Sequence, residues 1–281
     1  MAQPLSLPKY TGKIGVFDSG VGGLTVLREI MGQLPHESLL YFGDTAWVPY
    51  GNRSQAELLQ FVREIITWMQ TQGAKMVVMA CNTSSALALE TVRSEFDLPV
   101  LGIILPGARA AAKTGRRIGV ISTVATARSN AYRQAILEAA PQAQVWQVGC
   151  PEFVPLIESD RIHDPYTRAV ALEYLAPLLA ADIDTLVYGC THYPHLAPLM
   201  DQLLPPSITV VNPASFLVAA MAKELDLLGL SSSQPKAEAE FYVSGDPTQF
   251  AQVSSQWLGF TPRVQQVSLA VLEQLAIASS V

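Results

Sequence analysis

The chain has 281 residues, of which 49% are hydrophobic and 15% are charged, and its net charge is −6. So many apolar residues exclude a disordered chain, and the length allows one large domain or two of medium size. The acidic balance argues against nucleic acid as a partner, because phosphate contacts need clustered lysine and arginine.

The cysteine count and the absence of long apolar runs point to one compartment. Cys81, Cys150 and Cys190 are the only cysteines, and an odd, small number does not form a disulfide framework but suits a reducing environment. Residues 1–9 contain no apolar run that would mark a signal peptide. No run of about 18 apolar residues predicts a membrane span. We therefore expect a cytoplasmic protein with no membrane partner.

Short apolar runs alternate with amphipathic stretches along most of the chain. Their continuous apolarity is typical of parallel strands that are covered on both faces. A helical stretch in the first third opens with Ser54 and Glu57, the spacing of a capping box. The alternation predicts an α/β fold with parallel sheets flanked by helices. The expected strands are Ile14–Phe17, Leu39–Phe42, Met76–Ala80, Val100–Ile104, Ile118–Ile121, Val145–Val148, Thr185–Tyr188 and Ile208–Val211.

The C-terminal part follows a linker that we place at Gly229–Ala239, which is rich in serine with glycine and proline. Beyond it we expect strands at Glu240–Ser244 and Val264–Val267 around a helix at Pro247–Leu258. This tail is too short for a domain of its own, so we expect it to complete the first half of the chain.

A weak internal repeat relates the two halves. Lys13–Ser19 reads KIGVFDS and Arg117–Thr123 reads RIGVIST, and in each half an apolar strand later ends in a cysteine followed by polar residues. Chance is the alternative, because strands of α/β proteins resemble one another. The repeat favours two pseudo-symmetric domains, each with one cysteine at the carboxyl edge of its sheet, where ligands bind in such folds.

Three segments at strand ends carry candidate chemistry. Asp18-Ser19-Gly20-Val21-Gly22-Gly23 is either a tight turn or a site for an anion or amine, and it lacks the spacing of a dinucleotide fingerprint. Cys81 and Cys190 each stand at the start of a helix, which is expected to lower a thiol pKa. A buried structural cysteine is the alternative for each, but two at matching places favour a joint role.

The remaining candidates are less specific. His192 either assists Cys190 or is a hydrogen-bonded turn residue. Cys190, His192 and His195 suggest a zinc site only weakly, because no second cluster accompanies them, so we expect no metal. Glu152 is a candidate acid, whereas Cys150 is expected to pack in the core. Trp68 and Trp257 are also expected to be core residues.

Taken together, five segments resemble glutamate racemase, of the aspartate/glutamate racemase family. They are GVFDSGVGGLTVLRE (Gly15–Glu29), YFGDTAWVPYG (Tyr41–Gly51), ACNTSSA (Ala80–Ala86), CPEFVPLIE (Cys150–Glu158) and GCTHYP (Gly189–Pro194). The resemblance implies two α/β domains with the site in the cleft between them, and a reaction on L- and D-glutamate that needs no cofactor. It also implies that the product, D-glutamate, enters peptidoglycan.

The resemblance implies roles by position. Cys81 and Cys190 are the acid and base, assisted by Asp18, Glu152 and His192. The implied substrate contacts are Asp18, Ser19, Tyr50, Gly51, Asn82, Thr83, Thr191 and His192. The implied domains are residues 1–106 with 214–281 on the Cys81 side, and 107–213 on the Cys190 side. Trp47 and Leu105 depart from the family pattern, where arginine and glutamate are common.

Other functions remain as alternatives. The nearest is racemisation of aspartate or of a hydantoin within the same superfamily. A cysteine hydrolase would use Cys81 as nucleophile and His192 as base, without needing Cys190. A non-catalytic amino-acid-binding protein is the third alternative. Exposed apolar residues such as Trp47 favour self-association, and we expect a homodimer.

Overall fold

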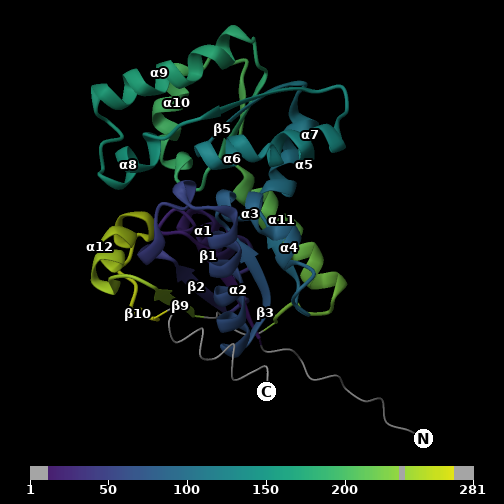
Figure 1. The fold of residues 1–281 in the computed structure, drawn as a ribbon, viewed down its shortest axis with the longest axis vertical. Helices are drawn as coiled ribbons and strands as arrows, with labels where there is room; N and C mark the ends of the chain where they lie inside the picture. Colours follow the sequence, from purple (N-terminus) through teal and green to yellow (C-terminus); the bar gives the residue numbers. More distant parts are fainter. Residues whose placement is uncertain (1–11, 234–237, 269–281) are drawn as a thin grey trace, which may run out of the picture.

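The structure is a computed structural model that describes residues 12–233 and 238–268, and it forms two α/β lobes (Figure 1). The lower lobe in that view contains the first strands of the chain together with the C-terminal strands and α12. The upper lobe contains the central part of the chain. Residues 1–9, which the sequence analysis considered as a signal peptide, lie outside the described residues, as do parts of the linker and of both chain ends.

The first sheet orders its strands β10-β9-β2-β1-β3-β4, and every neighbouring pair is parallel. Alternate side chains along each strand pack into the helical layers on opposite faces of the sheet. Phe17 and Phe42 pack with α2, whereas Val16 and Tyr41 pack with α1 and α12. The strands are β1 (Lys13–Asp18), β2 (Leu39–Gly43), β3 (Ala74–Met79), β4 (Val100–Gly102), β9 (Ala239–Val243) and β10 (Val264–Gln266). Both faces are therefore buried, which explains the continuously apolar strands.

The second sheet orders its strands β6-β5-β7-β8, again with parallel pairs. Its strands are β5 (Arg117–Ser122), β6 (Gln144–Gly149), β7 (Thr185–Gly189) and β8 (Thr209–Val211). This order matches β2-β1-β3-β4 of the first sheet, and the repeated segments are the corresponding strands β1 and β5. The prediction of two similar halves with parallel sheets is confirmed.

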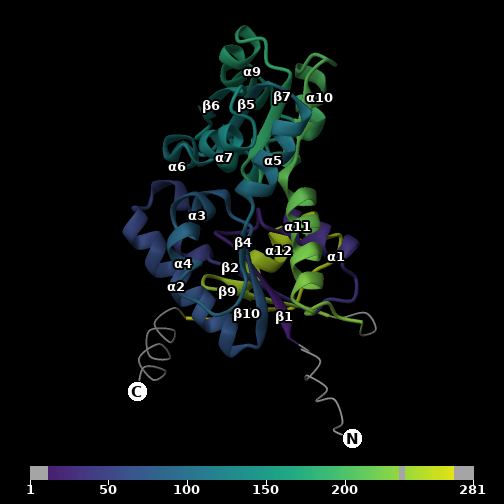
Figure 2. The same cartoon turned by 90° about the vertical axis from the view of Figure 1, so that its right-hand side faces the viewer.

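Helices cover both sheets and connect their strands. They are α1 (Leu24–Gln33), α2 (Gln55–Thr71), α3 (Asn82–Leu87), α4 (Leu89–Val92), α5 (Ile104–Thr114), α6 (Val124–Ser129), α7 (Ala131–Ala139), α8 (Phe153–Glu158), α9 (Pro165–Ala180), α10 (Ala197–Leu203), α11 (Pro213–Leu227) and α12 (Pro247–Leu258), with short 3₁₀ turns η1 (Thr45–Trp47), η2 (Tyr50–Asn52) and η3 (Tyr193–Leu196). The chain passes between the lobes at α5 and α11, which pack together at the junction (Figure 2).

Most predicted elements are confirmed, with small differences at their ends. The capping box is present, because the Ser54 hydroxyl accepts from the Glu57 amide and the Glu57 carboxylate accepts from the Ser54 amide. The strand expected at Val100–Ile104 ends at Gly102, and Ile104 begins α5. The tail forms β9, α12 and β10 and completes the first sheet, as expected. Trp68 and Trp257 are core residues.

A buried ion pair fastens the segment after α11 to the first sheet. Lys75 on β3 lies 2.6 Å from the Glu37 carboxylate, and both side chains are less than 5% exposed. The Lys75 ammonium also donates to the carbonyl of Leu230, and Glu37 accepts from the amide of Ser232. These contacts hold residues 230–232 against the strand ends that lie opposite the cysteines.

We predict that Lys75→Ala destabilises the fold by about 3–5 kcal/mol, because it leaves the Glu37 carboxylate buried without its counter-charge. Urea unfolding of the variant measures this loss. The control is Arg63→Ala, which breaks the exposed ion pair of Arg63 and Glu95 and should cost no more than about 1 kcal/mol. Equal losses in the two variants would contradict a special contribution from the buried pair.

Candidate active site

A cavity of about 370 Å³ lies between the carboxyl ends of the two sheets. Its wall combines residues that follow β1, β2 and β3 of the first sheet with residues that follow β5, β6 and β7 of the second. The structure therefore brings most of the predicted site residues together in the cleft. Those that line the cavity are Ser19, Tyr50, Gly51, Cys81, Asn82, Thr83, Cys190, Thr191 and His192.

Cys81 follows β3 and precedes the first turn of α3. Its side chain is buried, with the sulfur 3.9 Å from the Ser19 hydroxyl. Burial and the nearby charge of Asp18 raise the pKa of this thiol to about 12. The expectation that the helix start lowers the pKa of Cys81 is wrong. Burial disfavours the charged thiolate, and this effect outweighs any lowering by the N-terminus of the short helix α3. In these surroundings Cys81 is therefore a neutral thiol at neutral pH.

Cys190 follows β7 and lies beside His192, whose Nδ1 is 3.8 Å from the Cys190 sulfur. The other ring nitrogen of His192 is 2.9 Å from the Glu158 carboxylate. Burial alone would lower the pKa of His192, but the hydrogen bonds with Cys190 and Glu158 raise it to about 10. His192 therefore carries a positive charge at neutral pH, directly beside Cys190. This charge can balance a thiolate at that position.

Glu158, which the sequence reasoning missed, is the acid that contacts His192, whereas Glu152 was the acid expected on this side of the site. Glu152 does not line the cavity, and its carboxylate accepts hydrogen bonds from the hydroxyls of Tyr166 and Tyr174. The two acids stand at opposite ends of α8, so only the later one reaches His192. The signal was present in the sequence, because Glu158 is the last residue of the CPEFVPLIE segment.

Asp18 is buried and is not among the residues that line the cavity, so the substrate contact expected for it stays a prediction. Its carboxylate is fully buried and accepts from the Gly20 amide at 3.0 Å and from the Thr191 hydroxyl at 3.1 Å. Burial raises the pKa of Asp18, while the charge of His192 and these hydrogen bonds oppose the rise. Asp18 thus joins the two domains beneath the site.

The glycines after Asp18 make room for the second domain. A Cβ at Gly22 would lie 2.4 Å from both His192 Nδ1 and the Thr191 hydroxyl. The Thr25 hydroxyl, in the first turn of α1, donates to the Thr191 carbonyl at 3.0 Å. Of the two readings of this glycine-rich segment, the structure therefore supports a turn that allows close approach between the domains.

Thr123 also lines the cavity and was missed from the sequence. Its hydroxyl is 3.0 Å from that of Thr83, so it forms a hydrogen bond across the cleft. The internal repeat could have identified it, because KIGVFDS and RIGVIST align Thr123 with Ser19. Cys150 is buried as expected, but it contributes to the cavity wall as well.

The loop after β2 supplies Tyr50 and Gly51 to the cavity. The Tyr50 hydroxyl donates to Asp44 at 2.5 Å, and burial raises the pKa of Asp44 to about 6. Trp47 does not line the cavity but stacks on Phe61, with 5.0 Å between the ring centres. The unusual Leu105 lies on α5, also outside the cavity wall.

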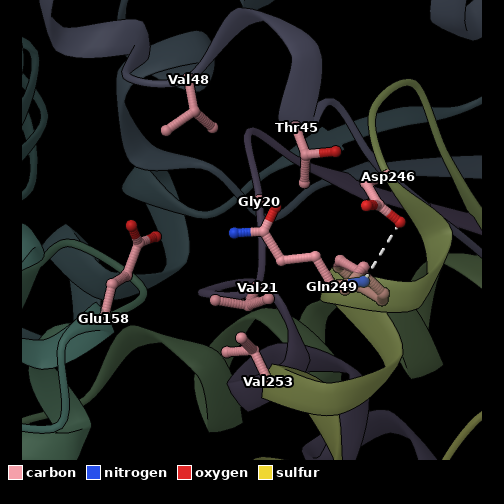
Figure 3. A pocket seen from close by; sticks show the side chains of 9 residues that line it. Gly20, Val21, Thr45, Val48, Glu158, Asp246, Gln249 and Val253 are labelled. Atoms are coloured by element: carbon pink, nitrogen blue, oxygen red, sulfur yellow. Dashed lines mark hydrogen bonds between the residues drawn. The ribbon is translucent and has the colours of Figure 1, made fainter.

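A second, smaller cavity of about 200 Å³ adjoins the first (Figure 3). Glu158 and Val48 line both cavities. Figure 3 shows Glu158 on one side and Asp246 with Gln249, from the start of α12, on the other. Asp246 caps this helix by accepting from the Gln249 amide at 3.2 Å. The Glu158 side chain therefore lies between the two cavities, and it contacts His192 on the side of the larger one.

His195 behaves differently from His192. Its ring lies 3.8 Å from that of Trp257, and burial with the nearby charges of His192 and Arg28 lowers its pKa to about 4. It is therefore neutral. No group of His, Cys, Asp and Glu in the described part of the chain is arranged to hold a metal ion. Within that part, no helix is long and apolar enough to span a membrane.

Comparison with known proteins places the chain in a family. The family model described as Asp/Glu/Hydantoin racemase matches residues 19–221. The chain belongs to this family. A glutamate racemase of Rippkaea orientalis (strain PCC 8801 / RF-1) is 68% identical over 256 residues, which are 91% of each chain. The family membership confirms the resemblance carried by the five sequence segments.

Solved structures of the family confirm the fold. Glutamate racemase isoform RacE1 from Bacillus anthracis has a TM-score of 0.90 at 37% identity, covering 92% of this chain and 98% of that one. Glutamate racemase from Francisella tularensis, solved in complex with D-glutamate, has a TM-score of 0.87 at 33% identity, covering 93% and 99%.

We predict that Glu158→Gln lowers kcat/KM on the order of 10²-fold, the lower end of general acid–base contributions. Without the Glu158 carboxylate the His192 imidazolium loses stabilisation, so its pKa falls and the ring loses its proton at a lower pH. The basic limb of the pH profile of kcat/KM should therefore move to lower pH.

The matched control for this prediction is Glu152→Gln, which makes the same change at the other end of α8. It should leave the pH profile in place, because Glu152 contacts Tyr166 and Tyr174 rather than the cavity. A shift of the basic limb in Glu152→Gln, and none in Glu158→Gln, would show that Glu152 rather than Glu158 acts on His192.

Proposed function

We propose that the chain interconverts L- and D-glutamate without a cofactor, with Cys81 and Cys190 as the acid and base. The observation that carries this proposal is that Cys81 and Cys190, which follow the equivalent strands β3 and β7 of the two sheets, line a single cavity. The curated relatives named glutamate racemase, among them one 68% identical to this chain, support the choice of substrate.

The arrangement suits racemisation because the reaction needs a proton to leave one face of the α-carbon and another to arrive on the opposite face. The two enantiomers have equal free energy, so the catalyst must work in both directions. With one thiolate and one thiol, the two cysteines exchange roles at each turnover. A single nucleophilic cysteine with a histidine base does not provide this symmetry.

The charged groups around the two thiols differ, and the α-ammonium group of the substrate would compensate for this difference. Cys190 has the His192 imidazolium beside it, with Glu158 holding the far side of the ring. The residues that shift the pKa of Cys81 include no cation but do include the negative Asp18. An α-ammonium group placed near Ser19 and Asp18 would supply the missing positive charge and favour a thiolate at Cys81.

The developing negative charge on the substrate needs hydrogen-bond donors. The amides of Asn82 and Thr83 lie in the first turn of α3, where backbone N–H groups lack intrahelical acceptors. The Asn82 side chain and the Thr83 hydroxyl also face the cavity. Donors fixed in this way stabilise charge that builds up on a substrate carboxylate.

The hydrolase alternative receives less support from the geometry. His192 contacts Cys190, whereas a hydrolase with Cys81 as nucleophile would need the imidazole beside Cys81. Racemisation of aspartate or a hydantoin remains the second candidate, because the matching family model covers these substrates as well. A panel of amino acids and hydantoins would separate it from the first.

The proposal extends to the setting of the enzyme. We place it in the cytoplasm, where thiols stay reduced and where D-glutamate would supply peptidoglycan synthesis.

The domain limits proposed are residues 1–106 with 214–281, and 107–213; they fall in the first turns of α5 and α11. A homodimer is also proposed, and light scattering of the purified protein would measure it.

We predict that reduced, purified protein in heavy water removes the circular dichroism of L-glutamate while deuterium enters the α-position, without added cofactor. Both signals follow from exchange of the α-proton through thiols that equilibrate with solvent. Loss of dichroism can be followed directly and deuterium by proton NMR. Binding of glutamate with neither signal would exclude racemisation and favour a binding protein.

We predict that Cys81→Ser and Cys190→Ser each lower racemisation by roughly 10²–10⁴-fold, the usual contribution of a general acid or base. A serine hydroxyl is far less acidic than a thiol and cannot take over either role. Cys150→Ser changes the third buried cysteine in the same way and should keep measurable racemisation. Strong activity in either of the first two variants would remove the two-base assignment.

A further inference from the structure

Tyr132 is a buried residue of the second domain that touches the first domain beside Cys81. It lies on α7, its side chain is fully buried, and its hydroxyl donates to the side-chain oxygen of Asn82 at 2.7 Å. Asn82 follows Cys81 directly and lines the cavity. The hydrogen bond therefore crosses the cleft from one domain to a site residue of the other.

This contact determines which end of the Asn82 amide is free. The oxygen accepts the Tyr132 proton, so the amide nitrogen Nδ2 is left as a donor. That nitrogen is buried and has no hydrogen-bond partner among the described residues. A buried donor without an acceptor costs about 1–3 kcal/mol. Because Asn82 lines the cavity, a ligand there can supply the missing acceptor.

Tyr132 also touches the loop that carries the second cysteine. A Cβ at Gly189, the residue before Cys190, would lie 3.2 Å from the Tyr132 ring. Burial, and next the charge of Cys190, raise the pKa of the Tyr132 hydroxyl. The hydroxyl therefore keeps its proton and remains a donor to Asn82 whichever thiol is ionised during turnover.

We propose that Tyr132 is a positioning residue that fixes the Asn82 amide with Nδ2 aimed into the cavity, where it donates to a carboxylate oxygen of the substrate. The proposal rests on the function proposed above. An ammonium group is not the recipient, because it offers only donors. Without the Tyr132 hydroxyl, the Asn82 amide can turn and present its oxygen to the substrate instead.

The test is Tyr132→Phe, which removes the hydroxyl and keeps the ring that packs against Gly189. The KM for glutamate should rise roughly tenfold, in keeping with the loss of one hydrogen bond, while kcat changes less, because the bond forms with both the bound substrate and the transition state. Tyr242→Phe is the control, since its hydroxyl donates to Glu240 on the same strand, β9, and Tyr242 does not line the cavity; the KM of this variant should not change.

A double-mutant cycle separates positioning from a general structural effect. Asn82→Ala should raise KM, and adding Tyr132→Phe to it should raise KM no further, since there is no amide left to orient. A full additional rise in the double variant would overturn the proposal. If Asn82→Ala impairs the enzyme but Tyr132→Phe does not, this inference fails alone; if Asn82→Ala has no effect on an active enzyme, the assignment of the site itself fails.

A second variant keeps the test independent of the stability of Tyr132→Phe. In Asn82→Asp the Tyr132 hydroxyl still donates to one carboxylate oxygen, so the other oxygen faces the substrate carboxylate and repels it. KM should therefore rise more in Asn82→Asp than in Asn82→Ala. Glutamate binding to Asn82→Asp as tight as to the unchanged protein would contradict a carboxylate at this position.

Discussion

The site depends on contacts that hold two separate sheets end to end. The buried carboxylate of Asp18, at the end of β1, accepts a hydrogen bond from Thr191, which follows Cys190 in the other domain. Thr25 binds the Thr191 carbonyl from the same side, and Gly22 lacks the Cβ that would collide with His192. Because each thiol belongs to a different domain, these contacts fix the geometry in which both line one cavity.

The two halves are similar in fold but unlike in charge. β1 and β5 occupy the same place in their sheets, and each domain contributes a cysteine from the equivalent strand. Among the described residues, only those on the Cys190 side include a protonated histidine that is held by a carboxylate. In the function proposed above, a reaction that runs equally well in both directions uses an unequal pair of bases, and the charge of the substrate offsets the difference.

The sequence predicted what depends on local pattern. Apolar runs identified the strands, the repeat identified the two halves, and the cysteine segments identified most of the cavity wall. It did not distinguish Glu158 from Glu152, because which end of α8 faces His192 is decided by packing between elements. The raised pKa of Cys81 and the burial of Asp18 also depend on packing across the domain junction. Tyr132 carried no local signal, since its partner Asn82 lies 50 residues earlier.

The burial of Cys81 has a consequence for the survival of the protein. Peroxide and other oxidants attack the thiolate far faster than the thiol. Burial raises the pKa of Cys81 to about 12, so this sulfur presents little thiolate to an oxidant. The same burial that places Cys81 in the wall of the cavity therefore also protects its sulfur from oxidative damage.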